Sequence, residues 1–115
     1  MRILTFYGSY GYKPNETFSG SVCFCHVEKN ETPEKIAKIA AKLILLSQGS
    51  KVILVPFAHL YEDVAESPVA RTIFEQLHDK IGSLGHDVMC APFGITKELH
   101  FDVPADDSAI KFLNF

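Results

Sequence analysis

Apolar residues recur every three or four positions in two stretches of this 115-residue chain, residues 36–44 and 70–84. This period places them on one face of a helix, so the pattern predicts two amphipathic helices. Each stretch has a hydroxyl residue followed by proline near its start and a glycine at its end, as helix termini commonly do. These signals are Thr32-Pro33 and Gly49 for the first helix, and Ser67-Pro68 and Gly85 for the second.

Five other apolar runs are short and rich in β-branched or aromatic residues, which is typical of β-strands. They cover residues 1–7, 21–27, 52–57, 87–91 and 96–103. The last run alternates apolar and polar residues up to Pro104, as a half-buried strand does. The glycine, proline and asparagine residues between positions 8 and 20 predict an irregular loop with room for a hairpin turn. The apolar tail, residues 109–115, is expected to pack on the domain or on a partner.

The order of these elements predicts an α/β fold in a single domain, residues 1–115, because a chain of this length suffices for one core but not for two. Residues 52–57 and 87–91 flank the second helix, as the two strands of a β-α-β unit do. We therefore expect these two strands to be parallel neighbours joined by a right-handed crossover.

Both strands of this unit end in nearly the same residues, Val55-Pro56-Phe57-Ala58-His59 and Ala91-Pro92-Phe93-Gly94. Proline supplies no N–H to a sheet and tends to end a strand, and the alanine or glycine after each phenylalanine lets a ligand approach the backbone. In open α/β sheets, ligands bind in the crevice outside the carboxyl ends of parallel strands. The functional site is therefore expected at these two Pro-Phe turns.

Composition excludes several classes of protein. The net charge is −3, so the chain lacks the basic face that grips long duplexes, and any contact with nucleic acid should be small and local. The longest apolar run, around residues 36–46, is interrupted by two lysines and is too short to span a membrane. The first residues do not resemble a signal peptide, and the 3 cysteines form an odd number. We therefore expect a cytoplasmic protein with reduced thiols.

Two side chains are placed to reach the crevice. Period two puts Lys97 on the same, inward face of its strand as the apolar residues of that strand. Lys97 either extends to water from the first position of the strand, or presents a cation to an anionic or carbonyl oxygen. His59 directly follows the first Pro-Phe turn. It is either structural or able to orient water, donate to a sugar hydroxyl or transfer a proton.

The sequence predicts no metal site, cofactor motif or protein nucleophile. Cys23, Cys25 and His26 are close in sequence, but period two puts the cysteines on one face of the strand and the histidine on the other, which argues against zinc. Cys90 lies in an apolar strand without a neighbouring base, so we expect a buried thiol. The dinucleotide fingerprint, the phosphate loop and the nucleophile elbow are missing from the sequence.

Several of these segments together resemble the archaeal-type N-terminal editing domain of threonyl-tRNA synthetase. They are Met1-Arg2-Ile3-Leu4, Val27-Glu28-Lys29, Val55-Pro56-Phe57-Ala58-His59-Leu60, Ser67-Pro68-Val69-Ala70, and Ala91-Pro92-Phe93-Gly94 with Lys97. The resemblance implies a mixed sheet with two main helices, a fold shared with D-aminoacyl-tRNA deacylases, in a dimer. It also implies hydrolysis of serine wrongly attached to threonine tRNA, with the 2′-hydroxyl of the terminal adenosine assisting the attacking water.

The resemblance also assigns residues to the site. Lys97 and His59 would lie at the ester and the terminal ribose as catalytic residues, and Glu28 is a further candidate for substrate binding. A wall too close for the extra methyl group of threonine would be formed by Val27, Ala58, Phe93 and Gly94. The implied partners are the aminoacylated 3′ end of threonine tRNA, a second copy of the chain, and a threonyl-tRNA synthetase that lacks its own editing domain. No cofactor is implied.

The chain differs from the family pattern in three places. The first strand leads into Tyr7-Gly8-Ser9-Tyr10 instead of His-Ser-Asp-Tyr, Thr96 replaces the tyrosine before the lysine, and Ile110 stands where a glutamate is expected. These differences leave open a second hypothesis, a dimeric module that binds a tRNA acceptor end or a synthetase without catalysis. A third hypothesis is the related removal of D-amino acids from tRNA.

Overall fold

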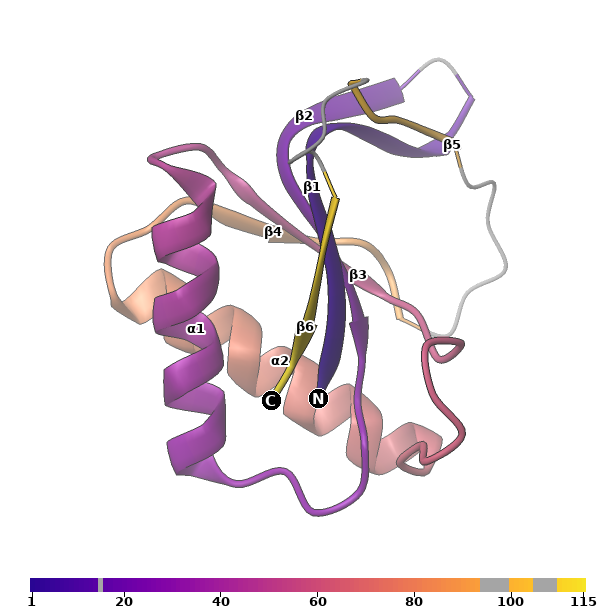
Figure 1. Cartoon of the computed structure of the whole chain (residues 1–115), viewed down its shortest axis with the longest axis vertical. Coiled ribbons are helices and arrows are strands. Elements are labelled where there is room, and N and C mark those ends of the chain that lie inside the picture. Colours follow the sequence, from indigo (N-terminus) through magenta and orange to yellow (C-terminus); the bar gives the residue numbers. More distant parts are fainter. Residues whose placement is uncertain (15, 94–99, 105–109) are drawn as a thin grey trace.

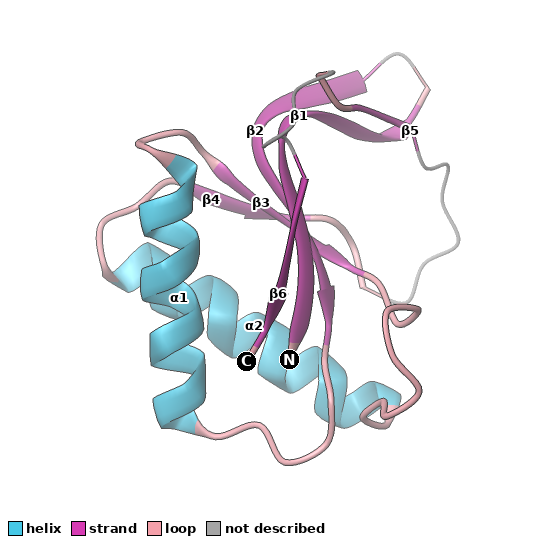
Figure 2. Ribbon diagram, viewed as in Figure 1, coloured by secondary structure: helices cyan, strands magenta, loops and turns pink. Residues whose placement is uncertain are grey.

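The computed structural model of the protein describes residues 1–14, 16–93, 100–104 and 110–115. In these residues a six-stranded sheet packs against two helices (Figure 1, Figure 2). The helices are α1 (Pro33–Ser47) and α2 (Ser67–Ser83), and the strands are β1 (Arg2–Lys13), β2 (Glu16–His26), β3 (Val52–Pro56), β4 (Val88–Cys90), β5 (His100–Asp102) and β6 (Ile110–Asn114). The predictions of an α/β fold and of two main helices are confirmed.

The sheet is mixed, as the family resemblance implied. Its strand order is β4-β3-β2-β1-β5, and β6 also pairs with β1. β2, β3 and β4 are parallel to one another, whereas β1 is antiparallel to β2, β5 and β6. β3 and β4 are therefore parallel neighbours, as predicted for the strands on either side of α2.

β1 and β2 form a long antiparallel hairpin, so the prediction of an irregular loop over residues 8–20 is wrong for most of that segment. β1 has 12 residues and β2 has 11. The glycines that predicted turns instead let neighbouring backbone approach the hairpin closely. A side chain at Gly20 would place its Cβ 2.5 Å from the Lys51 carbonyl oxygen, and one at Gly8 would collide with the Asp102 carbonyl oxygen.

Local signals set most of the helix ends. The Thr32 hydroxyl accepts a 3.2 Å hydrogen bond from the Lys35 N–H and so caps α1, and Gly49 follows its end with a positive φ of 86°. The start of α2 differs from the prediction, because the N-cap is Glu66 rather than Ser67 and its side chain makes no capping hydrogen bond. Neither helix in the described residues is long and apolar enough to cross a membrane.

The two faces of the sheet are covered differently. On one face, side chains of both helices, such as Leu43 and Leu77, join sheet residues such as Leu54 in a single core cluster. Both helices therefore cover this face, which we call the helical face. The cluster on the opposite face contains no helix residue and is rich in aromatic rings, so we call it the aromatic face. Its buried members are Phe6, Tyr10, Val22, Phe24, Ile53, Val55 and Ala91.

The strand predicted at residues 96–103 is described only in part, as β5 and the residue that follows it. Phe101 of β5 is 51% exposed, and its ring centroid lies 5.7 Å from that of Phe6 and 5.5 Å from that of Phe24. Phe101 thus packs half-buried on the aromatic face. Lys97 and the other residues at the start of the predicted strand lie outside the described residues.

The apolar tail packs on the domain, as predicted, and does so as a strand that was not predicted. β6 runs antiparallel to the first half of β1. Leu113 packs against the helical face, whereas Ile110 and Phe112 are 56% and 52% exposed. The Phe115 N–H donates to the Met1 carbonyl oxygen at 3.0 Å, so residues 1 and 115 lie side by side (Figure 1).

Candidate functional site

Three parallel strands end side by side at one edge of the sheet. β2 ends at His26, β3 at Pro56 and β4 at Cys90. The pairing joins Cys25 to Pro56 and Leu54 to Cys90, so the segments after these strands leave the sheet at the same edge. Ligands of α/β proteins bind at this kind of edge. We call it the carboxyl edge.

The segment after β3, residues 57–65, is fixed to the end of β2 by backbone hydrogen bonds. The Phe57 N–H donates to the Cys25 carbonyl oxygen at 3.0 Å, and the Ala65 N–H donates to the Val27 carbonyl oxygen at 3.1 Å. These bonds hold the two ends of the segment, which we call the β3 loop. Its position is therefore set by the neighbouring strand.

His26 holds the middle of the β3 loop. Its side chain is fully buried, and its Nδ1 accepts a 3.3 Å hydrogen bond from the Leu60 N–H. A ring nitrogen that accepts carries no proton, so the neutral ring has its hydrogen on Nε2, which donates to the Asp63 carbonyl oxygen at 2.6 Å. Sequence reasoning considered His26 only as a metal ligand and missed this role, for which the one signal was its place at the end of a strand beside the site.

Ala58 and His59 lie on the exposed part of the β3 loop. The His59 ring packs edge-on against Phe57 with a centroid distance of 5.0 Å, and Phe57 lies 5.2 Å from Phe24 on the aromatic face. The imidazole of His59 is therefore supported by aromatic packing and remains accessible to a ligand.

The second Pro-Phe turn is a neighbour of the first, but its phenylalanine lies on the other face of the sheet. The Ala91 N–H donates to the Leu54 carbonyl oxygen at 2.8 Å, which keeps the turn beside β3. Phe93 then packs against Phe74 in the helical face, with ring centroids 6.0 Å apart. The Arg71 guanidinium donates to the Phe93 carbonyl oxygen at 3.3 Å. The phenylalanine of the first turn packs on the aromatic face instead.

The two residues after β2 have contacts that were not predicted. The Val27 side chain is 5% exposed and packs in the helical face. The Glu28 carboxylate accepts a 2.9 Å hydrogen bond from Arg2 Nε, and the Arg2 guanidinium lies 3.7 Å from the ring centroid of Tyr61. Because Tyr61 belongs to the β3 loop, Arg2 links Glu28 to the segment that carries Ala58 and His59.

Comparison with known proteins decides the family. The model of the archaea-specific editing domain of threonyl-tRNA synthetase matches residues 12–109. The chain belongs to this family. It is 33% identical over 78 residues to a threonine–tRNA ligase of Thermofilum pendens, and 37% identical over 82 residues to one of Pyrococcus horikoshii. These alignments cover 64% and 66% of this chain but 13% of each ligase, so this chain matches a small part of their length.

The fold of this editing domain is also found in a solved structure, that of the c-Myc DNA Unwinding Element Binding Protein. The two superimpose with a TM-score of 0.79 over 99% of this chain and 97% of the other, at 9% sequence identity. At that identity the similarity concerns the fold alone. The fold is the D-aminoacyl-tRNA deacylase-like fold, which confirms the prediction.

Two of the residues predicted for the editing site, Lys97 and Gly94, lie outside the described residues, as does Thr96. Their placement stays a prediction. Phe93, at the carboxyl edge, is the last described residue before them. Of the other predicted residues, the structure brings Val27, Glu28, Ala58 and His59 to the carboxyl edge together with Phe93.

The cysteines of the editing domain are poor nucleophiles at neutral pH, because a thiol must ionise to attack. Burial raises the pKa of Cys23 to about 11 and that of Cys90 to about 12, and it raises the pKa of Cys25 as well. Cys23 and Cys25 both pack in the helical face, as period two predicted. Within the described part of the chain, no group of three His, Cys, Asp or Glu side chains is arranged to hold a metal ion.

Proposed function

We propose that this editing domain hydrolyses the ester bond of serine wrongly attached to threonine tRNA. The observation that supports the proposal is the meeting of the β3 loop, the end of β2 and the second Pro-Phe turn at the carboxyl edge, in a chain of the threonyl-tRNA synthetase editing family. The aminoacylated 3′ end of the tRNA would approach this edge from outside the sheet, where Ala58 and His59 are exposed.

Discrimination of serine from threonine needs such a second site. Serine lacks one methyl group of threonine, and a missing methyl is worth about 1–3 kcal/mol in a binding pocket. An editing pocket reverses the selection by excluding the larger substrate. The short side chain of Ala58 suits a wall of this kind. The buried side chain of Val27 and the partly buried side chain of Phe93 hold the adjoining backbone in a fixed position.

The proposed reaction is direct attack of water on the ester carbonyl. The carbon–oxygen bond to the ribose then breaks, which releases serine and leaves the ribose hydroxyl protonated. The Lys97 ammonium would stabilise negative charge on the carbonyl oxygen, and His59 would bind the terminal ribose or orient the water. The 2′-hydroxyl of the terminal adenosine would assist that water. The raised thiol pKa values favour this route over a cysteine nucleophile.

The deciding experiment measures deacylation of seryl- and threonyl-tRNA by the chain. We expect serine to be released about 10- to 100-fold faster than threonine, because the pocket would exclude the methyl group. Loss of both esters at the rate seen without protein would contradict the proposal.

Two substitutions test the assigned catalytic residues. Lys97→Ala and His59→Ala should each lower the rate of seryl-tRNA hydrolysis about 100-fold. Lys42→Ala is the matched control, because Lys42 is an exposed lysine on α1 and no part of the carboxyl edge. An equal loss of activity in all three variants would contradict the assignment.

Ile110 favours a second function, in which the chain binds without catalysis. Its partner would be a tRNA acceptor end, or a threonyl-tRNA synthetase that lacks its own editing domain. The family places a glutamate at this position, whereas here an apolar side chain is exposed on β6. This function predicts tRNA binding without turnover, and residual hydrolysis that Lys97→Ala leaves unchanged.

The third candidate function is removal of D-amino acids from tRNA. Its test compares the hydrolysis of D- and L-aminoacyl esters of the same tRNA.

A further inference from the structure

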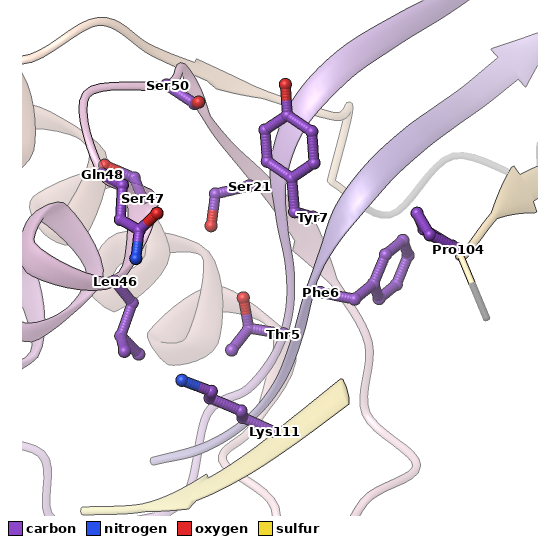
Figure 3. Close-up of a pocket in the computed structure, with 10 residues that line it drawn as sticks. All are labelled: Thr5, Phe6, Tyr7, Ser21, Leu46, Ser47, Gln48, Ser50, Pro104 and Lys111. Carbon is purple, nitrogen blue, oxygen red and sulfur yellow. The ribbon is translucent and has the colours of Figure 1, made fainter. Parts of the chain in front are cut away.

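A cavity of about 460 Å³ opens beside the C-terminal end of α1, away from the carboxyl edge (Figure 3). Its walls come from β1, β2, β6 and the end of α1. Ser21 in this wall pairs with Val52, the first residue of β3, whereas the carboxyl edge lies at the last residue, Pro56. None of the described residues assigned to the editing site lines the cavity. The cavity is therefore a separate feature of the molecule.

At the cavity, the apolar side chains of the helical face give way to polar ones. On the helical face, β1 presents Ile3 and then Thr5, and β2 presents Cys23 and then Ser21. Thr5 and Ser21 are each 4% exposed, so two hydroxyl groups are buried directly beside the apolar core. Burying a polar group costs free energy unless it finds a partner. The Thr5 hydroxyl lies 3.4 Å from the Cys23 sulfur, and either atom can donate in this hydrogen bond. Both hydroxyl groups point into the cavity (Figure 3).

Lys111 adds a positive charge to this wall. It faces Thr5 across the β1–β6 pairing, and its ammonium group points into the cavity (Figure 3). Within the described residues, no carboxylate lies within ion-pair distance of Lys111 and none lines the cavity. The Gln48 amide and the hydroxyl groups of Ser47 and Ser50 complete the polar lining, although the Ser47 hydroxyl already donates to the Ile44 carbonyl oxygen at 2.6 Å. His86 Nε2 fixes that side by its 2.7 Å hydrogen bond to the Ser50 carbonyl oxygen.

This lining suits an anionic group that accepts several hydrogen bonds at once. A phosphate carries strong acceptor oxygens that point in different directions, and a charged partner strengthens each bond. Tyr7 follows Thr5 on the same face of β1, lines the cavity and is 58% exposed. Its ring offers a surface on which a nucleobase can stack. The volume falls in the range of small-molecule pockets.

We propose that this cavity binds one nucleoside monophosphate unit, with its phosphate at Lys111 and its base against Tyr7. The ribose hydroxyls would bond to the Gln48 amide and the Ser50 hydroxyl. A free nucleotide and one nucleotide of an RNA strand present the same phosphate, ribose and base, so either can supply the unit. Binding here does not depend on hydrolysis at the carboxyl edge.

The test is an NMR titration of the isotope-labelled full chain with adenosine 5′-monophosphate, uridine 5′-monophosphate, adenosine and inorganic phosphate. We expect the two nucleotides to shift the amide signals of Thr5, Ser21, Ser50 and Lys111 in a saturable way, and to leave those of Ala58 and His59 in place. Adenosine and phosphate should bind more weakly than the nucleotides. The absence of saturable shifts with either nucleotide, or shifts confined to the β3 loop, would overturn the proposal.

Two substitutions test the proposed contacts of the nucleotide, that of its phosphate with Lys111 and that of its base with Tyr7. Lys111→Met should weaken binding of the nucleotides about tenfold or more, because it removes a charge-assisted hydrogen bond. Tyr7→Leu should weaken nucleotide binding about fivefold or more and leave phosphate binding unchanged, because it removes only the stacking surface. Lys42→Met on α1 is the matched control and should bind as the unmodified chain does. Equal weakening by both lysine variants would overturn the role of Lys111.

A short single-stranded RNA distinguishes the two sources of the unit. If a tetranucleotide displaces adenosine 5′-monophosphate from the same amides and requires Lys111, the cavity takes a nucleotide of an RNA strand. If the mononucleotides bind and the RNA does not compete, the cavity takes a free nucleotide. Both results support the proposal, and RNA binding that is insensitive to Lys111→Met, without mononucleotide binding, contradicts it.

Discussion

His26 is a single buried side chain that holds a whole loop, because its two ring nitrogens bond to the backbone of the β3 loop in opposite senses. We predict that His26→Leu frees this loop, since both the Leu60 N–H and the Asp63 carbonyl lose their partner. Leaving such groups unpaired costs about 1–3 kcal/mol each. Hydrogen exchange should therefore be faster at the Leu60 amide, and seryl-tRNA hydrolysis should be slower.

His26→Gln is the matched control, because its side-chain amide keeps one donor and one acceptor. It should restore part of the exchange protection at Leu60 and part of the activity. Unchanged protection in His26→Leu would contradict the role of His26, whatever the activity of the chain, because hydrogen exchange is measured without tRNA.

The buried thiols predict a loss of stability at alkaline pH. The pKa of Cys23 rises from 9.0 to about 11 on burial, so above pH 9 the unfolded chain loses its proton while the folded chain keeps it. The unfolded state then binds fewer protons, and the free energy of unfolding falls as the pH rises from 9 to 11, by on the order of 2 kcal/mol for this thiol. This decrease in the free energy of unfolding is measured by denaturant titration under reducing conditions at pH 7, 9 and 10.5.

Cys23→Ala should show a smaller decrease over the same pH range than the unmodified chain, after its own loss of packing is subtracted at pH 7. A free energy of unfolding that stays constant up to pH 10.5 would contradict the pKa assignment.

At the residue scale, the sequence predicted which residues follow the strand ends better than it predicted their contacts. His59 and Ala58 lie where the Pro-Phe pattern predicted, because a strand end is a local property. The Arg2–Glu28 pair and the packing of Phe93 on the helical face were not predicted. Both depend on which segments meet in space, and residues 2 and 28 are brought together only by the pairing of β1 with β2.

Among the elements, the β1–β2 hairpin depends on glycine for steric room. We predict that Gly8→Ala destabilises the protein by about 1–3 kcal/mol, because the added methyl group would collide with the Asp102 carbonyl oxygen of β5. Gly82→Ala in α2 is the matched control, since the nearest atom to its Cβ lies 3.9 Å away and alanine favours a helix. Thermal unfolding compares the two, and equal effects would contradict the steric argument.

The helices were predictable and the hairpin was not, for a physical reason. Thr32-Pro33 and Gly49 act within a few residues of the helix ends that they specify, so sequence reveals them directly. Gly8 and Gly20 make room for backbone more than 30 residues away, at Asp102 and Lys51. Sequence cannot distinguish a glycine that turns the chain from one that admits a neighbouring strand. β6 was missed because its partner, β1, lies at the other end of the chain.

For the whole molecule, the exposed edge at β6 predicts a homodimer. β6 pairs with β1 on one side, and its Ile110 and Phe112 side chains are exposed beside the aromatic face. Among the strands that the structure describes, β6 pairs with β1 alone. An unpaired strand edge with exposed apolar side chains is a ready surface for a second copy. We expect light scattering at micromolar concentration to give the mass of two chains, and Phe112→Asp to give the mass of one.

Leu45→Asp is the matched control, because Leu45 is 70% exposed on α1 and away from β6. It should leave the dimer intact. A monomer for the unmodified chain would contradict the dimer, and dissociation by both variants would contradict the choice of β6 as its contact.

The phenylalanines of the two Pro-Phe turns pack on opposite faces of the sheet. The carboxyl edge is therefore connected to both the aromatic face and the helical face. A ligand bound there would contact the backbone of both turns. The phenylalanine of the first turn packs among the rings of the aromatic face, and that of the second packs beside Phe74 and Arg71 on the helical face. Ligand binding at the carboxyl edge would therefore be coupled to the packing on both faces of the sheet. Mutations buried in either layer, far from the substrate, should alter how tightly it is held.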